Sequence, residues 1–333
     1  MDPLTRIRER ARQTRRRIVL PEYTEERMYA AAAYVLKEKI ADIVMCGEPD
    51  VIRANARKAG LNPSEIEIID HMKDPRRGEY VAEYLKLRSA KGVTPEQAEK
   101  VMSDSLFFGA MLVRKGLAEG SVAGALNSTP NVMRALIQIV RTAPGIKTVS
   151  SFFLMVTGNP QFGVDGVLIY ADAGVVPDPT PEQLVDIAFA SSQNCRMLLE
   201  AEPKIAMLSY SSKGSAAGPL VDKVVTATRL LKEAHPELLV DGELQADAAL
   251  IPEVAKKKVG ESPVAGKANI LIFPDLNAGN IGYKLTERIG GAQAIGPLVQ
   301  GTAKPGNDLS RGCSYMDIAN VIAVTCLQAG TRG

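Results

Sequence analysis

Short apolar runs of strand type alternate with longer segments of helical periodicity along most of the chain. RRIVLPE at 16–22 and ADIVMCG at 41–47 have the first pattern. TEERMYAAAAYVLKEK, between them, predicts a helix with Thr24 as N-cap and Arg27 in its first turn. Such alternation is typical of parallel strands covered by helices on both faces. The sequence therefore predicts an α/β fold with mostly parallel sheets.

The alternation passes through two cycles, and a second series of strand-like runs begins near TAPGIKTVSSFFLMV. A chain of 333 residues is long for a single core, so we expect two α/β domains. The first would comprise residues 1–146 plus 295–333, and the second residues 147–294. Because the chain passes twice between the domains, we expect an interdomain cleft that holds the active site.

The composition limits the classes of partner. The formal net charge is +2, so the overall field favours neither nucleic acid nor a membrane surface. RIRERARQTRRR at 6–17 is locally basic, but Glu9 interrupts it and a solvated helix is the simpler interpretation than an RNA-binding arm. No apolar run approaches the roughly 20 residues that span a bilayer. We expect a cytoplasmic protein without nucleic-acid or membrane partners.

The cysteines and histidines offer little for metal or triad chemistry. The four cysteines form no CxxC pair, which fits a reducing compartment. His71 and His235 lack an HExxH context, and we expect both at the surface. Asp172 and Asp178 flank AGVVP and could hold a metal ion, but loops after strands commonly carry such residues. We expect no metal and no permanently bound cofactor.

The stretch PGNDLSRGCSYMDI, at 305–318, leads from a polar loop into an apolar run. Ser314 and Asp317 have the S-x-x-D spacing of a capping box, with Ser314 as N-cap and Asp317 as the third helical residue. On this interpretation Asp317 only caps a helix.

The same loop also supports a functional interpretation. A helix N-terminus suits a phosphate, and Arg311 adds a planar fork of donors. Ser310 offers a hydroxyl, and Asp317 a carboxylate that can accept a proton. This inventory fits transfer of an acyl group between phosphate and another nucleophile. The two interpretations are compatible, because a capping carboxylate can also be catalytic.

Other cations are candidates for anion binding. Arg88 ends one predicted helix, and Arg134 lies one turn into another that Thr129, as N-cap, and Pro130 open. Ser128 and Thr129 add hydroxyls at that helix start.

Lys284 and Arg288, in YKLTERIGG, have the i, i+4 spacing of one helical face. They are either a second anion contact or a solvated face. Arg88 and Arg134 could likewise be only solvated.

Several long stretches, in the same order, make the whole chain resemble the phosphate acetyl/butyryltransferase family, and in particular its phosphate acetyltransferases. They include SVAGALNSTPNVMRALIQIV, DGVLIYADAGVVPDPTPEQLVDIA, ANILIFPDLNAGNIGYKLTERIGGAQAIGP and PGNDLSRGCSYMDI. The resemblance implies two α/β domains, usually in a homodimer. It implies reversible acetyl transfer, acetyl phosphate + CoA ⇌ acetyl-CoA + phosphate, with coenzyme A as a substrate.

The resemblance also implies roles for individual residues. Asp317 aligns with the family's proposed base for the CoA thiol, Arg311 with the arginine that stabilises the transition state, and Ser310 with a serine that assists there. Arg88 and Arg134 align with arginines implicated in binding CoA or phosphate. The chain departs from many members in VTGNPQFG, which lacks their cysteine and so favours a route without an acyl-cysteine.

The implied mechanism is direct thiolate attack in a ternary complex. An ordinary aspartate is a weak base for a thiol, and full proton transfer would be uphill by roughly 6 kcal/mol. We therefore expect Asp317 either to lie in a partly desolvated site or to orient other groups. Cys313 is the competing nucleophile, because it neighbours Arg311 and a helix start.

Three alternatives stay open. A phosphate butyryltransferase would use the same residues on a longer acyl chain. The metal-dependent decarboxylating dehydrogenases share a related architecture but would need a nucleotide and a divalent metal. A non-catalytic module would bind CoA or phosphate without turnover.

Overall fold

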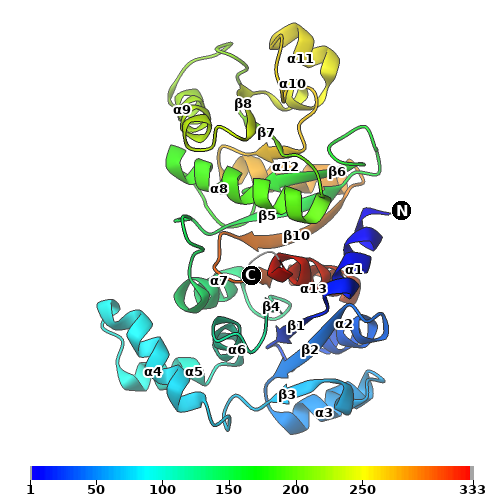
Figure 1. Cartoon of the computed structure of the whole chain (residues 1–333), viewed down its shortest axis with the longest axis vertical. Coiled ribbons are helices and arrows are strands. Elements are labelled where there is room, and N and C mark those ends of the chain that lie inside the picture. Colours follow the sequence, from blue (N-terminus) through cyan, green and yellow to red (C-terminus); the bar gives the residue numbers. More distant parts are fainter. Residues whose placement is uncertain (1, 331–333) are drawn as a thin grey trace. The chain divides into compact units, whose positions relative to one another are not determined.

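Two separate β-sheets organise the chain, one in each of two compact units (Figure 1). The computed structural model describes residues 2–330. The first unit comprises Met1–Ala143 and Thr302–Gly333, and the second comprises Pro144–Gly301. Helices flank both sheets, which confirms the predicted α/β class with mostly parallel sheets.

The sheet of the first unit has the strand order β11-β4-β1-β2-β3, and all four pairings are parallel. Its strands are β1 (Arg16–Leu20), β2 (Ala41–Cys46), β3 (Glu67–Ile69), β4 (Gly120–Ala123) and β11 (Gly306–Asp308). Because the strands run parallel, their carboxyl ends meet at one edge, where ligands of α/β proteins commonly bind.

The helices of this unit cover both faces of that sheet. They are α1 (Pro3–Thr14), α2 (Glu26–Lys37), α3 (Pro49–Lys58), α4 (Arg77–Arg88), α5 (Pro95–Met102), α6 (Ser105–Arg114), α7 (Thr129–Ala135) and α13 (Tyr315–Gly330). Short turns follow at Pro63–Glu65 and Ser89–Lys91, and a π-helical turn, Leu136–Val140, continues α7. Residues 318–328 of α13 are all buried, as expected of a helix that is apolar on most sides.

The sheet of the second unit has the order β10-β5-β6-β9-β7-β8. Its strands are β5 (Ser150–Val156), β6 (Val167–Ala171), β7 (Lys204–Leu208), β8 (Leu239–Leu244), β9 (Ile270–Ile272) and β10 (Gln293–Gln300). The pairings from β6 to β8 are parallel, whereas β5 pairs antiparallel with both β6 and β10. A direct loop joins β5 to β6, and no crossover helix lies between them to make them parallel.

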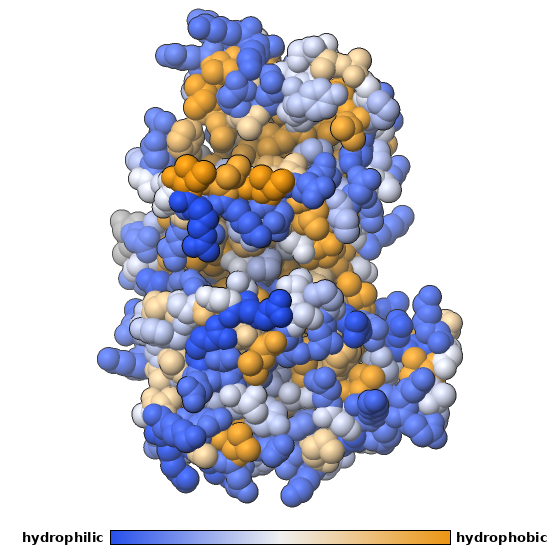
Figure 2. All heavy atoms as spheres, turned by 180° about the vertical axis from the view of Figure 1, so that it is seen from behind, coloured by the Kyte–Doolittle hydropathy of each residue, from blue (hydrophilic) through white to orange (hydrophobic). Residues whose placement is uncertain are grey.

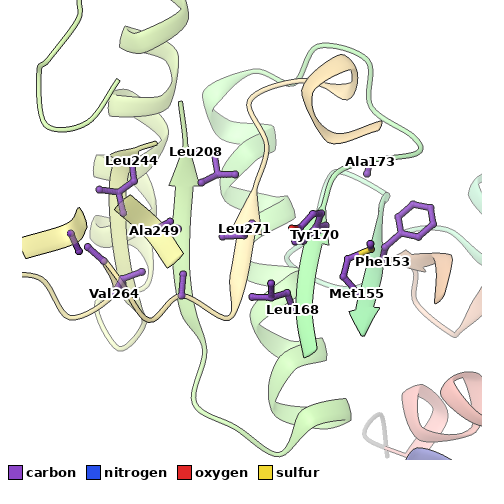
Figure 3. Packing of buried hydrophobic residues seen from close by; sticks show 14 of the residues in the cluster. Phe153, Met155, Leu168, Tyr170, Ala173, Leu208, Leu244, Ala249, Val264 and Leu271 are labelled. Carbon is purple, nitrogen blue, oxygen red and sulfur yellow. The ribbon is translucent and has the colours of Figure 1, made fainter. Parts of the chain in front are cut away.

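Helices pack on both faces of the second sheet, with α8 in front of it in Figure 1. They are α8 (Pro181–Asn194), which a π-helical turn extends through Leu199, α9 (Pro219–Ala234), α10 (Ala246–Leu250), α11 (Pro252–Lys258) and α12 (Leu276–Arg288). Alternate strand residues such as Phe153, Met155, Leu168 and Tyr170 form the core on one face (Figure 3). This period of two is what buries one side of a strand against helices.

Two local expectations about the C-terminal segment differ from the structure. We expected residues 295–301 in the first domain, but β10 pairs with β5 and lies in the second unit. We read PGND as loop, but Gly306–Asp308 form β11 beside β4. A three-residue edge strand carries too little apolar alternation to be recognised from sequence.

Two smaller expectations were wrong. His71 is buried at 5% exposure, and its ring centroid lies 6.0 Å from that of Tyr23 and 6.4 Å from that of Phe108. The N-cap of α2 is Glu25 in place of Thr24, because the Glu25 carboxylate accepts from the Arg27 backbone N–H.

Within residues 2–330, no helix combines the length and apolarity needed to cross a bilayer.

Candidate active site

The loop of residues 309–314 joins the buried edge strand β11 to the N-terminus of α13. The predicted capping box is confirmed. The Asp317 Oδ2 atom accepts from the backbone N–H and from the hydroxyl of Ser314, both at 2.8 Å, and the Ser314 hydroxyl accepts from the Asp317 N–H at 3.2 Å. Ser314 therefore precedes the first helical residue, and Asp317 is the third.

The predicted functional groups of this loop face outward. Ser310 and Arg311 are exposed, and Asp317 is partly exposed. The loop closes on itself, because the Cys313 N–H donates to the Ser310 carbonyl at 2.9 Å and the Gly312 N–H to the Ser310 hydroxyl at 3.3 Å. Ser310 and Arg311 thus lie on one short, exposed turn at the end of a strand, and Asp317 lies in the first turn of the helix that follows.

Cys313 points inward, unlike its neighbours, with 8% exposure. Burial raises the pKa of its thiol to about 11, although the Arg27 guanidinium favours the thiolate. A thiol that stays protonated at neutral pH is a poor nucleophile. This environment disfavours Cys313 as the acceptor of an acyl group.

Thr129 connects the start of α7 to the end of β11. Its hydroxyl donates to the Asp308 carboxylate at 2.5 Å. The N-cap is Ser128 in place of the expected Thr129, which is the first helical residue, and Ser128 makes no side-chain cap bond. The bond brings two segments that the sequence singled out separately into direct contact.

Sequence reasoning missed Asp308, which is fully buried at 0% exposure. Within residues 2–330 its Oδ1 atom has no hydrogen-bond partner. Burial raises the pKa of Asp308 to about 7, and the nearby carboxylate of Glu22 acts in the same direction. Its position beside Ser310 and Arg311 was visible in the sequence, but its burial was not.

Glu22 fixes the loop that leads into α7. It lies just after β1, is buried at 4% exposure, and accepts from the backbone N–H groups of residues 125–127 at 2.7–3.1 Å. Three aligned amides bound by one carboxylate give that loop a defined shape. The signal in the sequence was only an acidic residue after a strand.

Arg88 and Arg134 act on the same side chain, the hydroxyl of Tyr84. Burial raises the pKa of Tyr84. The charge and a hydrogen bond of Arg88 lower this pKa, and so does the charge of Arg134. The Tyr84 hydroxyl also donates to Gln138 at 2.7 Å. Within residues 2–330 the buried Arg88 Nε has no hydrogen-bond partner. The charges of both arginines thus act on the pKa of Tyr84, a residue that sequence reasoning missed.

Lys284 and Arg288 belong to the second unit, where both lie exposed on α12. Lys284 Nζ is 5.8 Å from the ring centroid of Tyr283, and Arg288 Nε is 3.3 Å from the Glu287 carboxylate. Both side chains are therefore accessible, as either interpretation of their spacing requires.

The candidate metal pair is engaged elsewhere. Asp172 accepts from the Ser151 hydroxyl at 2.5 Å and from backbone N–H groups of residues 174–176 at 2.8–3.2 Å. Asp178 pairs with Lys223 at 2.7 Å. In the part of the chain that the structure describes, no three His, Cys, Asp or Glu side chains gather as metal ligands would.

Comparison with known proteins adds a full-length likeness. A family model described as "Phosphate acetyl/butaryl transferase" matches residues 3–326. Proteins named phosphate acetyltransferase from Thermoanaerobacterium thermosaccharolyticum and Acetivibrio thermocellus are 51% and 50% identical, over 99% of this chain and 100% and 98% of their own lengths. The crystal structure of a phosphotransacetylase from Streptococcus pyogenes aligns with a TM-score of 0.93 at 39% identity, covering 98% of both chains.

Proposed function

The chain belongs to the phosphate acetyl/butyryl transferase family and is an acyltransferase, and from this premise we propose that it transfers an acetyl group reversibly between acetyl phosphate and coenzyme A. Identity of about one half to phosphate acetyltransferases, over nearly the whole chain, is the observation that supports this reaction most directly. The exposed cluster of Ser310, Arg311 and Asp317 supplies the functional groups that the reaction needs.

The chemical step is attack of the CoA thiolate on the acetyl carbonyl within a ternary complex. A carbon–sulfur bond forms, the carbon–oxygen bond to phosphate breaks, and the thiol proton leaves. Charge develops on the carbonyl oxygen, and Arg311 and Ser310, which are both exposed, are the candidate donors that would stabilise it. Because Cys313 is buried with a pKa of about 11, the direct route is favoured over an acyl-cysteine.

Asp317 is the candidate acceptor of the thiol proton. One of its oxygens is occupied by Ser314, while the other takes part in no hydrogen bond within residues 2–330. The occupied oxygen fixes the carboxylate at the helix start, and the second can face a substrate. The same carboxylate therefore caps α13 and can orient or deprotonate a thiol.

The two polyanionic substrates require several cations. Arg88 and Arg134, whose charges both act on the pKa of Tyr84, are candidates for the phosphates of CoA. Ser128 and Thr129 add hydroxyls at the start of α7, and Lys284 and Arg288 are exposed cations on α12. The substrate partners are thus acetyl phosphate, CoA and phosphate. We propose no metal and no permanently bound cofactor, since phosphate is already a fair leaving group.

A homodimer is part of this proposal. Three apolar residues, spaced four apart, are exposed on α12 and at its C-cap: Ile281 at 58%, Leu285 at 52% and the C-cap residue Ile289 at 81%. Figure 2 shows apolar side chains gathered in a strip across the surface of the second unit. Such a row is unusual on a monomer and suits a second copy. Sedimentation should give a dimer, and Leu285→Glu should shift it toward the monomer.

We place the enzyme in the cytoplasm, where its substrates occur. All four cysteines are free, as suits a reducing compartment. Fractionation of the source cells should recover the chain in the soluble cytoplasmic fraction.

The activity is tested by mixing purified protein with CoA and acetyl phosphate in the presence of EDTA and following thioester formation. Rapid turnover is expected. Butyryl phosphate, assayed in parallel, distinguishes a butyryltransferase by a higher kcat/KM on the longer chain. Binding of CoA without turnover on either substrate would leave a binding module and overturn the proposed reaction.

A further inference from the structure

Arg27 occupies a position where a cation is unfavourable. It is the second residue of α2, close to the positive end of the helix dipole, and its side chain is only 32% exposed. An arginine at such a place needs compensating acceptors.

The compensation comes from three backbone carbonyls in two separate loops. Arg27 Nη1 donates to the carbonyls of Arg311 at 2.7 Å and of Cys313 at 2.8 Å, and Nη2 donates to the Ala125 carbonyl at 3.0 Å. One guanidinium therefore joins the loop of residues 309–314 to the loop that leads into α7.

Glu25 fixes the guanidinium in this orientation. Its two carboxylate oxygens accept from Arg27 Nε at 2.7 Å and from Nη2 at 3.0 Å. This bidentate pair holds the pKa of the Glu25 carboxyl below its usual value. Because Glu25 is also the N-cap of α2, the orientation of Arg27 is tied to a helix.

The loop has few other restraints. Arg27 Nη1 also donates to Cys313 Sγ at 3.8 Å. Within residues 2–330, the hydrogen bonds of residues 310–314 to groups other than Arg27 are internal to the loop or join it to Asp317 or the first turn of α13. Gly312, which lies between the two bound carbonyls, is the residue whose backbone would move most freely. Loss of Arg27 would leave Arg311 on a loop anchored only at its two ends.

We propose that Arg27 is a positioning residue, which holds the backbone on both sides of Gly312 and so directs the Arg311 side chain toward the reacting carbonyl. This role rests on the proposed acyl transfer. Arg27 acts through Arg311 and does not itself touch the substrate. Because the role depends on a planar fork of donors, lysine cannot replace it.

The kinetic test compares Arg27→Ala and Arg27→Lys with a matched control, Arg53→Ala. Arg53 is exposed and, among residues 2–330, pairs only with Asp50. Both Arg27 variants should lose about 10–100-fold in kcat with a much smaller change in KM, whereas the control should keep its kcat. Guanidinium ion at a non-denaturing concentration should partly restore Arg27→Ala. A rise in KM alone would instead mark Arg27 as a substrate-binding residue and overturn the proposal.

A double-mutant cycle tests whether Arg27 acts through Arg311. The variant with both Arg27→Ala and Arg311→Ala should be about as slow as Arg311→Ala alone. If the two losses multiply, Arg27 acts independently and the proposal is wrong.

The Cys313 thiol gives a readout that needs no activity. Cys313 is 8% exposed, while Cys46, Cys195 and Cys326 are fully buried, so a thiol reagent reports on this loop first. Arg27→Lys keeps a cation near the Cys313 Sγ atom, which Arg27 Nη1 contacts at 3.8 Å, and should label at least about tenfold faster than wild type, because opening of the loop exposes Cys313. Arg27→Gln serves if the lysine variant does not fold.

Unchanged labelling in a folded Arg27 variant would contradict the positioning role. If wild type shows no acyl transfer but the labelling increases as expected, the proposed function fails while the structural role of Arg27 stands.

Discussion

Asp308 and Asp172 occupy similar places in the two units, yet their surroundings differ. Asp308 ends β11 and Asp172 follows β6, and both are buried, at 0% and 2% exposure. Asp172 receives the Ser151 hydroxyl and the backbone N–H groups of its own loop. Asp308 receives the Thr129 hydroxyl, while its Oδ1 has no partner within residues 2–330.

The difference shows two uses of an acidic residue at a strand end. The loop after β6 closes around its own carboxylate, so Asp172 serves the local fold. The loop after β11 leaves Ser310 and Arg311 exposed and depends on Arg27, from a distant helix, for its shape. We infer that the first loop is structural and that the second is organised for a ligand.

The largest expected difference between the two loops is the effect of a truncation in each loop on kcat. Arg311→Ala removes one donor from the candidate site and should lower kcat about 10²–10³-fold. Asp178→Ala, in the loop after β6, removes a carboxylate that is 82% exposed and should leave kcat unchanged. Steady-state kinetics with acetyl phosphate and CoA measure both. An equal loss of kcat in the two variants would contradict the assignment of the loop after β6 to structure and of the loop after β11 to ligand binding.

Removal of Asp172 should mainly affect stability. Asp172→Ala leaves the Ser151 hydroxyl and several buried N–H groups without their acceptor, and should lower the free energy of unfolding by about 3 kcal/mol or more. Urea unfolding followed by circular dichroism measures this loss. A variant as stable as wild type would show that the loop holds its shape without the carboxylate.

Asp308 should make the stability of the fold depend on pH. Since burial raises its pKa to about 7, the folded state keeps a proton that the unfolded chain releases near pH 4, and stability falls as pH rises between these values. Asp308→Asn removes this dependence. Relative to wild type, the variant should gain roughly 2 kcal/mol between pH 5 and pH 7.

Thermal unfolding of both proteins at the two pH values measures the difference. A constant difference between wild type and Asp308→Asn would mean that Asp308 is ionised throughout this range.

The smallest expected effect concerns the helix cap. Ser314→Ala removes the N-cap of α13 and should cost about 1 kcal/mol of stability. It also removes one of the two hydrogen bonds to Asp317 Oδ2, so a change in the pH profile of kcat would link the cap to the chemistry. Chemical unfolding and the pH profile, measured on the same preparation, distinguish the two consequences.

The features that the sequence predicted depend on residues close together in the chain. The alternation of strands and helices follows from local periodicity. The capping box follows from the spacing of Ser314 and Asp317, and the exposure of Ser310 and Arg311 from a polar, glycine-containing loop. Local propensity and short-range hydrogen bonds are sufficient for each of these.

The features that the sequence did not predict depend on contacts between distant residues. Arg27 lies 284 positions from Arg311, and Thr129 lies 179 positions from Asp308. The action of Arg88 and Arg134 on Tyr84 likewise requires α4 and α7 to be placed by the fold. No local pattern in the sequence encodes such a meeting, and β11 exists only because β4 offers a free edge.

The discontinuity of the first unit has a consequence for synthesis of the protein on the ribosome. Residues 144–301 form a continuous unit and can fold as soon as they emerge. The first unit lacks β11 and α13 until residues 306–330 have been made. A nascent chain therefore carries Arg27 and Arg134 long before it carries Arg311, and the candidate site cannot be complete before residues 306–317 have been made.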